Sequence, residues 1–284
     1  MRSRRIPRSP PAVLGVAILV AGHASISAGP LDNTRRLGLP EGVLEASVHD
    51  AGPPAVVFES GAGAACKMGN WAQVIDLLRG EATLFAYNRS GYGGSRIRRD
   101  LDDPGAVVEV LRRGLAEAGV APPYVLVGHS LGGVYMNLFA RLHPDEVAGL
   151  VLVDSSHPGQ FDDLREDKPL RYAMMVAGYT KGPPKVRYEL ANMNRIRREI
   201  ESAGPFPDVP LVVLTAGKSP SWQKEAEREW WLGLQSDLAS LSPRSRSRIV
   251  ESSGHFIQRD RPAEVADAIR EILAVATARG SEEE

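Results

Sequence analysis

The sequence predicts an α/β protein with a mostly parallel central sheet and helices on both faces. Short apolar runs rich in β-branched residues alternate along the chain with segments of helical periodicity. One of these runs, at 125–127, leads directly into Gly-His-Ser-Leu-Gly-Gly at 128–133, and a helical pattern follows at once. The 284 residues are enough for one large domain of this class with an insertion.

Each element is predicted from its own pattern. The segment 42–49 alternates weakly, which favours an early edge strand. The other strand candidates are mostly apolar runs, as expected for parallel strands buried on both faces, and the last of them is only a short strand. They lie at 55–60, 82–87, 125–127, 147–153, 211–214 and 248–250. Helical periodicity predicts helices at 71–78, 106–118, 222–241 and 263–278.

The strand rhythm stops between residues 155 and 207. This segment mixes charged and apolar residues and is broken by Pro183-Pro184, after which 185–202 has the pattern of an amphipathic helix. An excursion of about fifty residues within a compact domain normally has structure or a function of its own. We therefore expect an insertion at 155–207 between the core segments 30–154 and 208–280, the alternative being a surface excursion without a role at the site.

The first 29 residues have the three-part pattern of a secretory signal peptide. Four arginines lie within the first eight residues, an apolar run covers 12–22, and small residues follow. The apolar run is shorter than the roughly 20 residues that a membrane-spanning helix needs. The pattern predicts export and a mature protein without a stable membrane span, the alternatives being an uncleaved membrane anchor or a disordered basic tail.

The junction at Ser130 predicts a reactive hydroxyl. A serine between Gly128 and Gly132, where a strand meets a helix, lies on a turn too sharp for larger neighbours, and the turn holds the side chain out above the sheet. The following helix presents unpaired N–H groups and a positive partial charge to whatever binds there. Such a turn is a nucleophile elbow.

With this motif the chain resembles the α/β-hydrolase superfamily, in particular its lipase- and esterase-like serine hydrolases. The resemblance runs from about Pro54 to about Ala278. It implies the α/β-hydrolase fold, with the insertion at 155–207 forming a helical cap over the active site. The aspartate nucleophile of related dehalogenases and epoxide hydrolases is replaced here by Ser130, which argues against both activities.

A serine hydroxyl needs a base within hydrogen-bond reach. The family places its catalytic histidine in the loop between the last strand and the last helix, and His255 is at that position. The other histidines have structural explanations, since they lie in the leader, in an early strand, beside the serine, at a helix end and at the start of the insertion: His23, His49, His129, His143 and His157.

The acid that orients the histidine departs from the commonest family arrangement. No carboxylate follows the strand 211–214, where that acid usually lies. Asp154 ends the strand after the elbow, where some family members place the acid, and a carboxylate closing an apolar strand needs a partner. We predict that Asp154 is the acid, with Asp237 and Glu225 as weaker alternatives. The structural alternative is that Asp154 only caps the turn that follows the strand.

Negative charge develops on the substrate carbonyl oxygen, so N–H donors must already point at it. The resemblance implies the Leu131 N–H as one donor and a second from the loop 60–63, at Ala62, with Gly61 as the near alternative. Ser60 replaces a usual histidine there. The loop 87–95 is similar to the family's Asp-x-x-Gly-x-Gly-x-Ser loop, with Asn88 for aspartate, and has a structural role.

Together these residues predict a serine esterase that forms an acyl-enzyme on Ser130. The partner is a small acyl substrate, and the mechanism requires no cofactor. We expect no metal, because the carboxylates and histidines lack zinc-like spacing. A net charge of -1 gives no basic excess for nucleic acid. Thioester, amide or carbon–carbon substrates, and a non-catalytic binding protein of the same fold, are the alternative functions. The oligomeric state and the acyl preference do not follow from the sequence.

Overall fold

The computed structural model describes most of the chain after the leader. The described residues are 31–63, 68–98, 103–167, 169–170, 172–173, 189, 192–219 and 225–283. The predicted signal peptide lies outside them. Among the residues that are described, no helix combines the length and apolar character needed to cross a bilayer.

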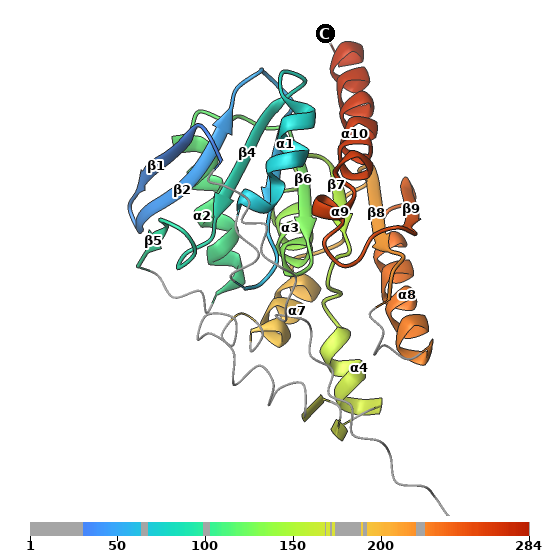
Figure 1. The fold of residues 1–284 in the computed structure, drawn as a ribbon. Coiled ribbons are helices and arrows are strands. Elements are labelled where there is room, and N and C mark those ends of the chain that lie inside the picture. Colours follow the sequence, from blue (N-terminus) through green and yellow to red (C-terminus); the bar gives the residue numbers. More distant parts are fainter. Residues whose placement is uncertain are drawn as a thin grey trace, which may run out of the picture.

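One nine-stranded sheet forms the centre of the described part of the chain (Figure 1). Its spatial order is β1-β2-β4-β3-β6-β7-β8-β9, and the short β5 pairs with β2. The pairs formed by β2 with β1, β4 and β5 are antiparallel, and all others are parallel. The strands are Thr34–Leu39, Gly42–His49, Ala55–Glu59, Thr83–Asn88, Arg96–Ile97, Tyr124–His129, Val147–Val153, Leu211–Ala216 and Ser245–Val250.

Helices cover both faces of the sheet, which confirms the predicted fold class. α1, α9 and α10 pack on one face, and α2, α3, α7 and α8 on the other (Figure 1). Their bounds are Ala72–Leu78, Pro104–Glu117, Leu131–Leu142, Gln160–Asp167, Met193–Ser202, Glu225–Ala239, Ile257–Asp260 and Pro262–Glu283 for α1, α2, α3, α4, α7, α8, α9 and α10. Short 3₁₀ turns occupy Met68–Trp71 and Pro144–Glu146.

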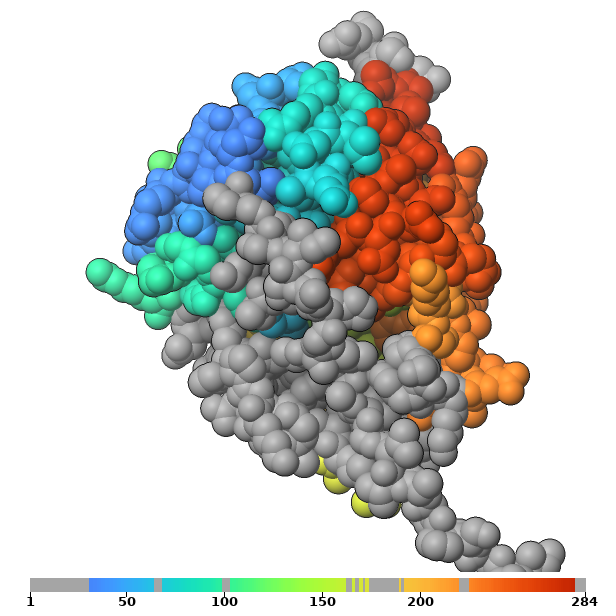
Figure 2. Space-filling model, viewed as in Figure 1, coloured from blue at the N-terminus to red at the C-terminus, as the bar shows by residue number. Residues whose placement is uncertain are grey.

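The two cores follow from the alternation of side chains along the buried strands. Leu126 and Leu152 point into the core under α2 and α3, whereas Val125 and Val151 point into the core under α1 and α10. The parallel strands β3, β6, β7 and β8 are therefore apolar on both faces. The edge strand β9 is the exception, because only Val250 of its residues is buried. Figure 2 shows α1 and α10 side by side on the surface that covers the second of these cores.

The first strand of the sheet was not predicted, and the prediction that 42–49 is an edge strand is wrong. β2 lies between β1 and β4, and β1 forms the edge. In β1 only Leu37 and Leu39 are buried, so its apolar content is too low to stand out from the surrounding sequence. Its extended conformation is instead fixed by antiparallel pairing with β2 across the tight turn at Pro40 and Glu41.

The insertion is described in part. Of the helix predicted at 185–202, the structure describes α7, whose buried face is Met193, Ile196 and Ile200. This face packs against α2 and α3 of the core. Residues 174–188, 190 and 191 lie outside the described residues, as do 220–224 at the start of the helix predicted at 222–241.

Candidate active site

The residues predicted to carry the chemistry follow the carboxyl ends of parallel strands. Ser130 follows β6, Asp154 follows β7 and the loop with His255 follows β9. In a parallel sheet these ends meet at one edge, which is where α/β proteins place their ligand sites. The topology thus places three residues that are up to 125 positions apart in the sequence at the same edge of the sheet, and the side chains of Asp154 and His255 are in direct contact there.

Ser130 has the strained backbone of a nucleophile elbow. Its φ is 52° and its ψ is -124°, outside the regions that a residue with a side chain ordinarily adopts. The strain is held by the next strand, because the Ser130 N–H donates to the Val153 carbonyl at 3.2 Å and the Ser130 carbonyl accepts from Ser156 N–H at 3.0 Å. Leu131 begins α3, where the first N–H groups have no partner within the helix.

The glycine after Leu131 is required by a close approach of two backbones. A Cβ on Gly132 would lie 2.4 Å from the Glu59 carbonyl oxygen and 2.7 Å from the Ser60 carbonyl oxygen. The loop that follows β3 therefore rests directly on the start of α3. This contact places the Leu131 N–H and the N–H groups of the loop 60–63 on adjoining pieces of backbone.

We expect Gly132→Ala to lower the free energy of unfolding by about 1–3 kcal/mol, because backbone atoms cannot yield as a flexible side chain can. Gly233→Ala is the matched control. Gly233 also lies inside a helix, α8, but a Cβ there has nothing within 4 Å. Alanine at Gly233 should be neutral or stabilise by about 0.5–1 kcal/mol. Urea unfolding of both variants measures the difference, and equal stabilities would contradict the close approach.

Asp154 is buried and surrounded by N–H donors. Its Oδ2 lies 2.7 Å from Nδ1 of His255. Its Oδ1 accepts from the Ala216 N–H at 3.0 Å and from the indole N–H of Trp231 at 3.1 Å. Three donors thus offset the cost of burying a carboxylate that is only 3% exposed. The alternative acids Asp237 and Glu225 are exposed on α8.

The loop that carries His255 is fixed by Asp260 at the end of α9. Its Oδ2 accepts from the Gly254 N–H at 2.9 Å and from the Ser253 hydroxyl at 3.3 Å. On the other side, the Ser253 carbonyl accepts from the Lys218 N–H at 2.8 Å. His255 is therefore presented by a short loop whose backbone is bonded to two neighbouring elements.

His129 ties the elbow to the His255 loop. Its Nε2 lies 3.0 Å from the His255 carbonyl oxygen, so this nitrogen carries the proton and donates it. The two imidazole rings are 4.7 Å apart, and the Phe256 ring is 5.1 Å from His129. Because the chain continues from His129 to Ser130, this bond sets the histidine loop beside the nucleophile.

Burial, aided by the neighbouring His255 ring, holds the pKa of His129 well below its ordinary value. The unfolded chain therefore binds a proton that the native state does not, so His129 should cost stability as the pH falls below about 6.5. We expect His129→Gln, which keeps an N–H donor, to flatten the dependence of unfolding free energy on pH by up to about 1.4 kcal/mol per unit between pH 6 and 4. Urea unfolding at several pH values measures this slope, and an unchanged slope would contradict the assignment.

The loop 87–95 is braced by a carboxylate from a neighbouring strand. The family has an aspartate at the position of Asn88. Here the negative charge at this loop comes instead from Glu45 on β2. Oε2 of Glu45 accepts from the Asn88 amide at 2.5 Å and from the Gly94 N–H at 2.7 Å. Oδ1 of Asn88 in turn accepts from the Met68 N–H at 3.1 Å.

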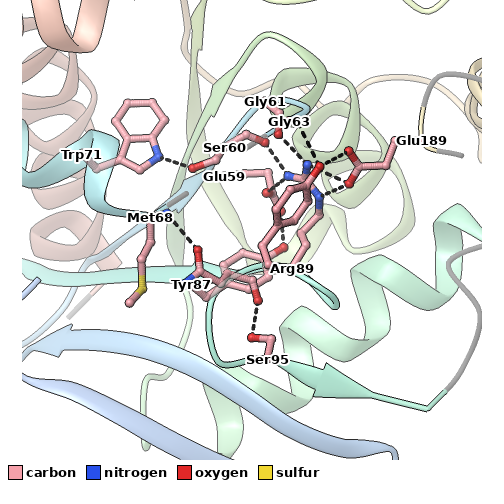
Figure 3. Close-up of polar contacts among 12 residues, drawn as sticks. Glu59, Ser60, Gly61, Gly63, Met68, Trp71, Tyr87, Arg89, Ser95 and Glu189 are labelled. Carbon is pink, nitrogen blue, oxygen red and sulfur yellow. Dashed lines mark hydrogen bonds and ion pairs between the residues drawn. The ribbon is translucent and has the colours of Figure 1, made fainter. Parts of the chain in front are cut away.

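Several residues that shape the site did not emerge from the sequence. Trp231 reaches Asp154 from α8, and Arg89 reaches the loop 60–63 from the glycine-rich loop. The sequence did contain a signal for Glu59, because this carboxylate ends an apolar strand and so needs a partner, as Asp154 does. In the structure Glu59 is 1% exposed. Figure 3 shows Glu59 and Glu189 on opposite sides of the Arg89 side chain, next to Ser60 and Gly61.

The strained serine and the sheet edge around it define an α/β protein of the hydrolase class. The family model described as "Alpha/beta hydrolase family" matches residues 56–268, which is most of the chain. The chain belongs to the alpha/beta hydrolase family. This membership confirms the resemblance that the elbow motif indicated.

Three comparisons place the chain among its relatives. It is 30% identical over 228 residues to the protein YqjL of Bacillus subtilis, covering 78% of this chain and 84% of that one. It is 26% identical to the sn-1-specific diacylglycerol lipase ABHD11 of Mus musculus, covering 96% and 98%. A thermophilic esterase from Thermogutta terrifontis has a TM-score of 0.56 at 19% identity, covering 86% and 98%, and this likeness concerns the fold alone.

Proposed function

We propose that the protein is a serine hydrolase that cleaves a carboxylic ester through an acyl-enzyme on Ser130. The observation that carries the proposal is the 2.7 Å contact between His255 Nδ1 and Asp154 Oδ2, on a loop that His129 bonds to the elbow. A carboxylate that accepts the Nδ1 proton fixes the tautomer in which Nε2 can take a proton from serine. The name of one relative, the sn-1-specific diacylglycerol lipase ABHD11, supports the same chemistry.

The proposed reaction has two halves. The Ser130 oxygen attacks the ester carbonyl carbon while its proton passes to Nε2 of His255, and the imidazolium returns that proton to the departing alcohol. A water molecule then attacks the acyl-enzyme, again losing its proton to His255, and the acid is released with Ser130 restored. The N–H groups of Leu131 and Ala62 would hold the oxygen anion of both tetrahedral intermediates.

Two further assignments belong to the proposal. The segment 155–207 would act as a cap, and its helix α7 is packed on α2 and α3. The leader 1–29 would direct the protein out of the cytoplasm. A chain extended by a reporter such as alkaline phosphatase, with and without residues 1–29, tests export directly.

A fluorophosphonate probe tests the enzymatic function, because it reacts with an activated serine and leaves a defined mass on it. Intact mass should increase by one adduct, and peptide mapping should locate that adduct on Ser130. A panel of p-nitrophenyl esters of graded acyl length then measures turnover and chain preference. A protein that takes up no probe and hydrolyses no ester would instead fit a binding protein of this fold.

A further inference from the structure

A buried ion cluster joins the loop 60–63 to the 155–207 segment. Arg89 is 3% exposed, and the two carboxylates that flank it, Glu59 and Glu189, are each 1% exposed. The guanidinium donates to Glu189 Oε1 through Nε at 3.1 Å and Nη2 at 3.0 Å, and it also donates to Glu59 (Figure 3). Glu59 and Arg89 belong to the core, whereas Glu189 belongs to the insertion.

Arg89 also bonds the backbone of the oxyanion loop. Its Nη1 donates to the Ser60 carbonyl, and its Nη2 donates to the Gly61 carbonyl at 2.5 Å. In a trans peptide the C=O and the following N–H point in opposite directions. The N–H groups of Gly61 and Ala62, the two candidate oxyanion donors, therefore point away from the guanidinium. Arg89 sets the orientation of both peptide planes.

Tyr92 makes a second link between the same loop and Glu189. Its hydroxyl accepts from the Gly63 N–H at 2.9 Å and donates to Glu189 Oε2 at 2.7 Å. Both oxygens of Glu189 are thus used, one on each of the two side chains that hold the loop. The Arg89 guanidinium also lies over the rings of Tyr92 and Tyr135, at 5.5 and 5.3 Å.

Burying three charged groups carries a large desolvation cost, so stability alone is a weak explanation of the cluster. Burial raises the pKa of Glu59, although Arg89 and the Tyr87 hydroxyl oppose the change. Replacing a buried ion pair by well-packed apolar residues is often neutral or stabilising, so geometry is the stronger reason for a fork of donors here. A planar guanidinium can hold two carbonyls and two carboxylates at fixed angles, which a single ammonium cannot do.

We propose that Arg89 is a positioning residue for the oxyanion hole, and that Glu189 of the insertion holds Arg89 in place. The bonds from Glu189 would then complete the hole, because they fix the side chain that orients its peptide planes. This inference rests on the proposed function. It adds that one residue of the insertion, Glu189, contributes to the strength of transition-state stabilisation.

The test compares Arg89→Lys with Arg270→Lys. Arg270 has the same kinds of partner, the Glu81 carboxylate and the Leu77 carbonyl at 2.8 Å, but it lies on the surface. We expect Arg89→Lys to lower kcat roughly tenfold to hundredfold, since one oxyanion donor is typically worth about 10² to 10³. KM should change less than about threefold, and Arg270→Lys should leave both constants unchanged.

A trifluoromethyl ketone supplies the readout that a purely structural role would not move. The Ser130 oxygen adds to the carbonyl carbon of the ketone and forms a hemiketal anion that resembles the tetrahedral intermediate. The inhibition constant of the ketone should therefore rise in Arg89→Lys by the same factor by which kcat/KM falls. Glu189→Gln, which keeps one acceptor for Arg89, should show the same pattern with a smaller factor. Glu189→Gln is the test if Arg89→Lys does not fold, and Tyr92→Phe measures how much the second link to Glu189 adds.

The outcomes separate this inference from the function on which it rests. A wild-type protein without ester turnover or probe labelling would overturn the proposed function. An active wild type whose Arg89→Lys and Glu189→Gln variants keep their kcat and their affinity for the ketone would overturn this inference alone. So would a variant that loses thermal stability or raises KM while kcat stays the same.

Discussion

Replacing Ser130 with alanine is expected to lower ester turnover by roughly 10³- to 10⁶-fold and to abolish fluorophosphonate labelling. The reason lies in the elbow, whose positive φ and tethered backbone present this one hydroxyl at the sheet edge. Alanine removes the hydroxyl and leaves the backbone bonds to Val153 and Ser156 in place. The variant should therefore fold normally and bind substrate while failing to acylate.

Ser240→Ala controls for the loss of a serine hydroxyl. Ser240 lies exposed after α8, and its hydroxyl donates to the Asp237 carbonyl at 2.7 Å. Its replacement should leave kcat, KM and labelling unchanged. If Ser130→Ala kept full turnover, the acyl-enzyme would have to form elsewhere and the mechanism proposed above would be wrong. If the wild type had no turnover to lose, the alternative of a binding protein would gain support.

Local patterns were sufficient for most of the fold. The inner parallel strands are apolar on both faces, so each is a run of buried residues that can be recognised without knowing its neighbours, as at Leu150 to Val153. β1 and β5 are different, because they depend on pairing with β2 and contain few apolar residues. Short antiparallel strands of this kind are specified by their partner more than by their own composition.

The same division holds at the site. Asp154 could be inferred because a carboxylate at the end of a buried strand needs a partner, and strand topology limits which partner can reach it. Trp231, 77 residues away, and Glu189, 100 residues from Arg89, carry no local sign of their roles. The exact direction of helix α8 and the seating of the insertion decide these contacts, and neither follows from periodicity.

Replacing Asp154 with asparagine is expected to lower kcat by about 10⁴-fold, as in other serine triads, while the fold persists. The reason is specific to this site, because Oδ1 accepts two N–H groups, from Ala216 and from Trp231. An asparagine must keep its carbonyl oxygen there, so its NH₂ group faces Nδ1 of His255. Nδ1 must then accept, the ring proton moves to Nε2, and the histidine can no longer take the serine proton.

Asp237→Asn is the matched control, because Asp237 is the alternative acid on the same helix as Trp231 and is exposed. It should keep wild-type kcat, whereas Asp154→Asn should lose it with KM little changed. Steady-state kinetics on one p-nitrophenyl ester measures both, and circular dichroism checks that both variants are folded. Full activity in Asp154→Asn together with a loss in Asp237→Asn would move the acid to α8. The 2.7 Å contact with His255 would then serve only to bury the Asp154 carboxylate.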